Sequence, residues 1–90
     1  MKKRSVPEPF FITPIIQGKQ TRLRVYHLRK TLSLEYYEVS GRDRKIVLTN
    51  NRPTLQRMDI PNVPLHWEVV EGEIKNLETL EAITKAIEAH

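Results

Sequence analysis

The fold is decided by residues 20–50, QTRLRVYHLRKTLSLEYYEVSGRDRKIVLTN. In this stretch, apolar and polar side chains alternate along three runs that are rich in β-branched and aromatic residues, as is typical of half-buried strands. The runs cover about residues 20–29, 34–40 and 45–50. The connections between them are short, and the second contains Gly41 and Asp43, which are common turn formers. The stretch therefore predicts an antiparallel meander of three strands.

The side chains that face each other across the strands predict the register. With a first connection centred on Thr31, apolar side chains face apolar ones and charges face opposite charges, which stabilises an antiparallel pair. The predicted partners there are Leu23 with Val39, Val25 with Tyr37, His27 with Glu35, Leu28 with Leu34, Tyr26 with Tyr36 and Arg24 with Glu38. Across the second connection, the predicted partners are Val39 with Ile46 and Tyr37 with Leu48. A slip of one residue would reverse the faces, so the face assignment is well determined.

The two faces of the predicted sheet differ in character. We call the apolar face, which has the composition of a core, face one. It consists of Leu23, Val25, Tyr37, Val39, Ile46 and Leu48. We call the opposite face, which mixes basic, aromatic and apolar side chains, face two. It consists of Arg22, Arg24, Tyr26, Leu28, Leu34, Tyr36, Glu38, Ser40, Lys45, Val47 and Thr49.

A C-terminal helix is predicted at about Leu77 to Ala89. Asn76 is a favourable N-cap, and apolar residues recur at helical spacing along one side. This stripe consists of Leu77, Leu80, Ile83 and Ile87. Because face one is the large apolar surface available, the stripe should pack against it.

The residues between the meander and the helix contribute a fourth strand. It is expected at about 65–70, where Trp67 is interpreted as a core anchor, and Gly72 ends it. Residues 54–64 are expected to be irregular, since prolines such as Pro61 cannot lie inside a helix. The predicted fold class is α+β: an antiparallel β-meander of three to four strands with one C-terminal α-helix packed on one face.

Length and composition restrict the kind of protein further. Ninety residues suit a single domain, which we expect over residues 10–90 after a flexible basic arm at residues 1–9. The chain contains no cysteine, and this excludes disulfides and thiol chemistry. No apolar run approaches the ~20 residues of a membrane span, and no signal-peptide core follows the basic start. We therefore expect a cytoplasmic protein without a membrane partner.

Charge is distributed unevenly along the chain. Residues 1–57 carry 13 Lys and Arg against 4 Asp and Glu, whereas residues 58–90 carry 2 against 7. A basic first part can attract polyanions. It can equally complement the acidic last part, within one chain or between subunits, and the charge counts alone favour this second interpretation.

Face two offers two functional interpretations. Basic residues that flank tyrosines on an open sheet suit single-stranded nucleic acid, which combines phosphate contacts with base stacking. The candidate nucleic-acid-binding residues are Arg22, Arg24, Tyr26, Tyr36 and Lys45. Alternatively, Glu38 neutralises Arg24, and the apolar Leu28, Leu34 and Val47 require a cover. That cover would be either another subunit or the Phe10–Ile16 segment, whose β-branched and aromatic content suits a strand at a sheet edge or outside the ladder.

We expect face two to be covered rather than to serve as a platform. The predicted function is thus a small non-enzymatic binding or assembly module of unknown partner that self-associates as a homodimer, with nucleic-acid binding as the alternative. In outline, three basic antiparallel strands and a C-terminal helix, the chain is similar to small DNA-binding domains that place a sheet in the major groove, such as integrase arm-binding domains. The similarity assigns no residue a role.

No side-chain pattern indicates an enzyme, a metal centre or a cofactor site. His27, His66 and His90 lack the spacing of metal ligands. The pair His27 and Glu35 is interpreted as structural rather than as an acid–base pair, although a position in a concave pocket would favour an enzyme. We predict no catalytic residue, no metal, no cofactor and no small-molecule substrate.

Overall fold

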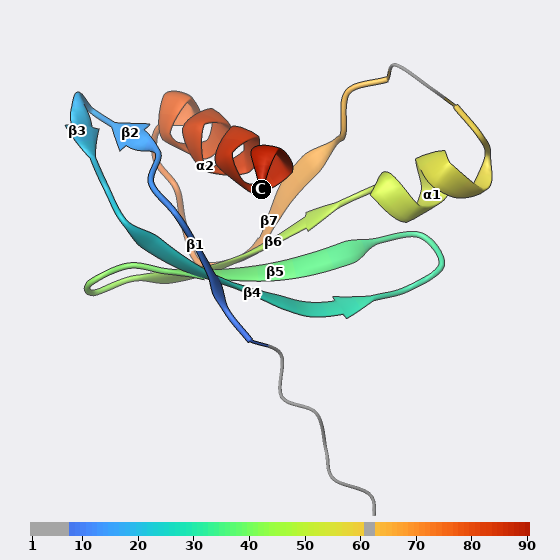
Figure 1. Ribbon diagram of the computed structural model, residues 1–90, viewed down its shortest axis with the longest axis horizontal. Helices are drawn as coiled ribbons and strands as arrows, with labels where there is room; N and C mark the ends of the chain where they lie inside the picture. Colours follow the sequence, from blue (N-terminus) through green and yellow to red (C-terminus); the bar gives the residue numbers. More distant parts are fainter. Residues whose placement is uncertain (1–7, 61–62) are drawn as a thin grey trace, which may run out of the picture.

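The computed structural model describes residues 8–60 and 63–90 (Figure 1). Its elements, in chain order, are β1 (Phe10–Ile12), β2 (Ile15–Ile16), β3 (Lys19–Gln20), β4 (Leu23–Lys30), β5 (Glu35–Ser40), β6 (Lys45–Asn50), α1 (Arg52–Arg57), β7 (Trp67–Glu71) and α2 (Leu77–Ala89). The basic arm predicted for residues 1–9 lies mostly outside the described residues. Within these ranges, neither helix has the length and apolar character needed to cross a membrane.

The α+β class is confirmed, with a larger sheet than the sequence predicts. Five antiparallel strands follow the order β1-β4-β5-β6-β7, and β2 and β3 form a separate two-stranded sheet. The additional strand, β1, pairs with the outer side of β4. Pro9 and Pro14 flank β1, which keeps it short and at the sheet edge, because proline cannot donate to a strand ladder.

The register of the second hairpin is confirmed and that of the first is wrong. Val39 lies opposite Ile46 as predicted, but Val25 lies opposite Val39, which is two positions from its expected partner Tyr37. The physical reason is the turn. Thr31 N donates to Leu34 O at 2.7 Å, and Thr31 Oγ1 accepts from Leu34 N at 2.9 Å, so four residues form the connection.

A bulge near the end of β4 also changes the strand pairing of this hairpin. The register shifts between His27 and Arg29, so that Arg29 lies opposite Tyr36 and Leu28 has no cross-strand partner. The predicted cross-strand alignments of Leu23 with Val39, Leu28 with Leu34, Tyr26 with Tyr36, Arg24 with Glu38, and His27 with Glu35 are therefore absent. The His27 and Glu35 side chains nevertheless meet, with His27 Nε2 3.7 Å from the Glu35 carboxylate. Arg24 lies opposite Ser40 instead, Tyr26 opposite Glu38, and His27 opposite Tyr37. A shift of two residues preserves the faces, because side chains alternate with period two.

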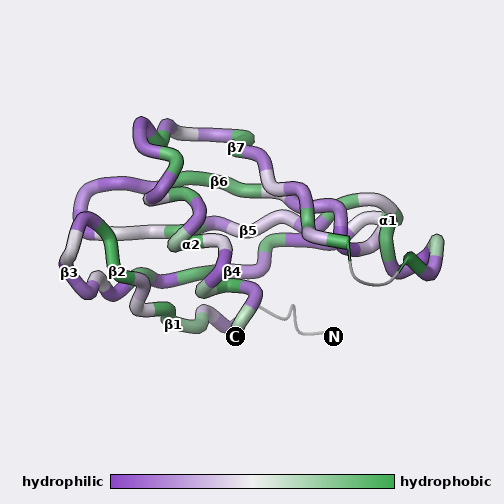
Figure 2. Tube along the Cα trace, turned by 90° about the horizontal axis from the view of Figure 1, so that it is seen from above, coloured by the Kyte–Doolittle hydropathy of each residue, from purple (hydrophilic) through white to green (hydrophobic). Residues whose placement is uncertain are grey.

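Face one is the core, as predicted. All six of its residues are buried, together with Ile12, Ile83 and Ile87. Helix α2 has the predicted bounds, and the side chain of Asn76 accepts a hydrogen bond from Glu78 N at 2.8 Å. Figure 2 shows α2 lying across the sheet when the molecule is seen from above.

One residue of the predicted helix stripe does not reach the core. Leu77 is 71 % exposed, whereas Ile83 and Ile87 are each 4 % exposed. Helical side chains tilt toward the N-terminus, so the side chain of the first helical residue projects beyond the end of the helix. Thr84 is buried on α2 instead.

The Phe10–Ile16 segment does not cover face two. Phe10, Ile12 and Ile16 pack against the core on the side of face one, and Phe10 stacks on His90 with ring centroids 3.9 Å apart. Alternation along β1 leaves Phe11, opposite Arg24, on face two. This segment is therefore part of its own chain's core, and the expectation that it covers face two is wrong.

The region after the meander contains a helix that the sequence analysis missed. Helix α1 occupies Arg52–Arg57, with Pro53 in its first turn. Proline is tolerated there because the first N–H groups of a helix have no partner within the helix. Farther along, Trp67 packs against the core as predicted and donates its indole N–H to Glu88 Oε2 at 2.7 Å.

Candidate nucleic-acid interface

Face two is open in the described part of the chain. Figure 1 shows α1, α2 and the β2–β3 hairpin all on the other side of the five-stranded sheet. Of the apolar residues that favoured a cover, Val47 is 8 % exposed, whereas Leu28, in the bulge near the end of β4, is 43 % exposed. Phe11 adds a ring that is 44 % exposed, so the open face combines basic, aromatic and apolar surface.

The strand register arranges face two in three rows that run across β4, β5 and β6. All five predicted site residues lie on this face. Direct partners define the rows as Arg24–Ser40–Lys45, Tyr26–Glu38–Val47 and Arg29–Tyr36–Thr49. Arg22 precedes β4 on the same side, beside Phe11. Each row thus contains an arginine, a tyrosine or both.

Two arginines of this face lie on aromatic rings. The guanidinium carbon of Arg22 lies 4.1 Å from the centroid of Phe11, and that of Arg29 lies 4.3 Å from the centroid of Tyr36. Such stacking fixes the plane of the guanidinium and leaves its N–H groups free at the edges. A ligand that has both phosphates and flat bases can bind the guanidinium N–H groups through its phosphates and stack its bases against the planar groups of each arginine–aromatic pair.

Sequence reasoning missed Phe11 and Arg29 as residues of this surface. Phe11 joins it only because β1 pairs with β4, and the sequence of residues 10–16 favours an edge strand without identifying the strand with which it pairs. Arg29 joins it because the bulge changes the side on which residues after His27 lie. A bulge has no clear signal in this sequence, which contains no glycine in β4.

The basic residues of face two have no carboxylate partner in the described residues. The ion pairs found there join His27 and Arg52 to Glu35, and His66 to Glu68. The expected neutralisation of Arg24 by Glu38 is absent, because Glu38 lies opposite Tyr26. Acidic side chains do occur on the face, at Glu38 and, on the outer strand β7, at Glu68 opposite Thr49 and Glu71 opposite Val47. The positive charges dominate the β1 and β4 side.

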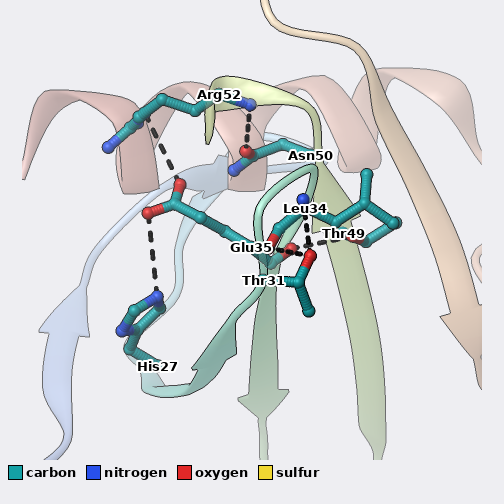
Figure 3. A network of polar contacts seen from close by, with 7 residues as sticks. All are labelled: His27, Thr31, Leu34, Glu35, Thr49, Asn50 and Arg52. Carbon is teal, nitrogen blue, oxygen red and sulfur yellow. Dashed lines mark hydrogen bonds and ion pairs between the residues drawn. The ribbon is translucent and has the colours of Figure 1, made fainter. Parts of the chain in front are cut away.

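A second cluster of polar residues lies on the opposite side, around Glu35 (Figure 3). The Glu35 side chain is 8 % exposed, and its carboxylate lies 3.7 Å from His27 Nε2 and 3.6 Å from Arg52 Nε. The buried Asn50 accepts a hydrogen bond from Arg52 N at 2.8 Å, and Thr49 Oγ1 donates to Glu35 O at 2.8 Å. These contacts join β4, β5 and β6 to α1, which supports the structural interpretation of the His27–Glu35 pair.

Tyr37 lies beside this cluster. Burial, followed by the nearby Glu35 carboxylate, raises the pKa of Tyr37 above its usual range, so the phenol is neutral at physiological pH. Within the described residues, none of Glu35, His27 and Arg52 lines the hollows beside the 41–45 loop or the hollow at the β1 edge of face two. In residues 8–60 and 63–90, no group of three or more His, Asp and Glu side chains is arranged to hold a metal ion.

The comparisons with known proteins assign no function to this site. No protein-family model, no curated protein sequence and no solved structure matches the chain.

Proposed function

We propose that the chain is a nucleic-acid-binding module that holds a single strand on face two. The observation that carries the proposal is the composition of an uncovered sheet face. Arg22, Arg24, Arg29 and Lys45 lie among three aromatic rings there, and none of the four has a carboxylate within ion-pair distance in the described chain.

Single-stranded nucleic acid fits this surface better than a duplex does. Rings on an open sheet can stack only with bases that are free of pairing, as in other sheet-based binders of single strands. From Arg24 to Arg29, β4 extends by about 16 Å, so the face accommodates a short stretch of a few nucleotides. Binding of this kind depends little on sequence, because every base has a flat π-face.

The electrostatic part of the proposal predicts a salt dependence. Four phosphate contacts give log K against log salt a slope of about −3, at roughly −0.7 per contact on a single strand. Arg24→Gln should bring the slope about 0.7 closer to zero, measured by fluorescence anisotropy with a labelled ten-nucleotide strand. Lys85→Gln is the matched control, because it removes the same charge from the exposed side of α2. Equal losses in both variants would indicate attraction by net charge alone and contradict the site.

The stacking part predicts a separate effect of the rings. Tyr36→Ala should weaken binding about 5- to 140-fold, which corresponds to ~1–3 kcal/mol per stacked base. Tyr36→Phe should bind nearly as tightly as the unchanged chain, since the phenyl ring stacks equally well. A Tyr36→Ala variant that has a lower melting temperature but unchanged affinity would make Tyr36 a structural residue and remove stacking from the proposal.

Self-association as a homodimer is the second candidate, and exposed apolar side chains favour it. Leu32 is 78 % and Met58 59 % exposed, at the end of the molecule where Thr54 Oγ1 of α1 donates to Ser33 O in the β4–β5 turn. Sedimentation over a range of concentrations should then reveal a dimer that Leu32→Ser shifts toward the monomer. A monomer at the highest concentration contradicts this candidate.

A further inference from the structure

We infer that face two contains a dedicated pocket for a terminal phosphate of the bound strand. The pocket is a hollow of about 440 Å³ at the β1 edge of the face, lined by Phe11, Arg22, Arg24, Ser40 and Gly41. None of these five residues is acidic. The inference rests on the proposed function, because it assigns one end of the same ligand to a defined place.

The geometry of the hollow concentrates positive charge on one small volume. Arg22 and Arg24 are two positions apart, so their side chains leave the same side of the chain about 7 Å from each other. The ring of Phe11 supports the Arg22 guanidinium, which restricts its orientation and reduces the entropy lost on binding. Ser40 lies directly opposite Arg24 and provides a hydroxyl donor.

A terminal phosphate uses this arrangement more fully than a phosphodiester does. Near neutral pH a phosphate monoester carries about −1.5 to −2 charges and three free oxygens, whereas a diester in the chain has one charge and two free oxygens. Two guanidinium groups and a hydroxyl supply enough donors for three oxygens. The terminal base can then stack on the outer face of the Arg22 guanidinium.

The position of the hollow also favours the end of a nucleic-acid strand. It lies beside β1, the outermost strand of the sheet on that side, while the second stacked pair, Arg29 with Tyr36, lies farther along β4 and β5. A nucleic-acid strand that starts in the hollow can therefore continue across the rows of face two toward Tyr36. The hollow would fix both the end and the direction of the strand.

The test uses one labelled ten-nucleotide strand in three forms: with a 5′-phosphate, with a 3′-phosphate and with neither. One phosphorylated form should bind about tenfold more tightly than the unphosphorylated strand. Arg24→Gln should abolish that preference, and Ser40→Ala should reduce it. Arg29→Gln, whose side chain lies outside the hollow, should weaken all three forms by the same factor and keep the preference.

Failure of this inference differs from failure of the proposed function. If the three strands bind with equal affinity, the terminal-phosphate pocket is wrong and single-strand binding stands. If no strand binds at low salt, the proposed function is wrong as well. A titration with a nucleoside monophosphate and with the matching nucleoside gives an independent readout. The monophosphate alone should shift the arginine Nε–H resonances of Arg22 and Arg24, and equal responses to both would overturn the pocket.

Discussion

Ile83→Ala is expected to lower the free energy of unfolding by about 2–5 kcal/mol, the range for large-to-small changes at fully buried positions. Ile83 is 4 % exposed and packs from α2 against face one. In a domain whose total stability is on the order of 5–15 kcal/mol, such a loss produces a large fall in the urea midpoint and the melting temperature.

Leu77→Ala is the matched control for this substitution. Both residues belong to the apolar stripe of the same helix, but Leu77 is 71 % exposed, so its truncation should change stability by no more than about 0.5 kcal/mol. Urea unfolding at equal protein concentration measures both values. Similar losses in the two variants would show that α2 does not pack as described.

Gly72→Ala is expected to destabilise the protein by about 3 kcal/mol, for two reasons that add. Gly72 has φ +85°, a conformation in which a residue with a Cβ is strained by ~1–3 kcal/mol. In addition, a Cβ there would lie 2.8 Å from the backbone oxygen of Lys45 and 2.8 Å from Ile46 Cγ2. The clash separates the end of β7 from β6, and the backbone oxygen cannot move away without distorting the sheet.

Gly18→Ala separates the two contributions. Gly18 has φ +79°, but an added Cβ would meet nothing within 4 Å, so only the backbone strain applies and the loss should be ~1 kcal/mol. The difference between the two variants, measured by thermal and urea unfolding, is the steric contribution at Lys45. An equal effect of both substitutions would mean that the strand end relaxes and that the close approach at Gly72 has little importance.

The elements that the sequence predicts well are those with a strong local signal. The four-residue turn after Ser40 and the capped helix after Asn76 both have residues that specify one geometry, and both are present as predicted. The predicted β4–β5 register is wrong. Matching of side chains across the strands determines the face on which each residue lies more strongly than it determines how far one strand is shifted along the other. A slip of two residues keeps every side chain before the bulge on its face, and the turn at Thr31 selects the register that forms.

The candidate site could be predicted as a set of residues but not as an arrangement. Alternation alone places Arg24, Tyr26 and Tyr36 on one face, and the structure confirms that. Alternation cannot determine which charges are neutralised, because Arg24 faces Glu38 in one register and Ser40 in the other. The two aromatic supports of arginine, at Phe11 and Tyr36, depend on how the edge strand pairs and on the bulge. The content of residues 10–16 favours a strand at a sheet edge but does not identify β4 as its partner, and the bulge has no pattern in the sequence.

The order of the strands also has a consequence for folding kinetics. Strand β7 joins β6 after a longer connection that contains α1, but β4, β5 and β6 follow one another through four-residue turns, so their pairings close short loops. Proteins dominated by such local contacts fold rapidly. The contact between Phe10 and His90 is different, because it joins residues at opposite ends of the described chain and closes the longest loop. We therefore expect the hairpins to form first and the docking of α2 beside β1 to follow as the slower, entropically costly step.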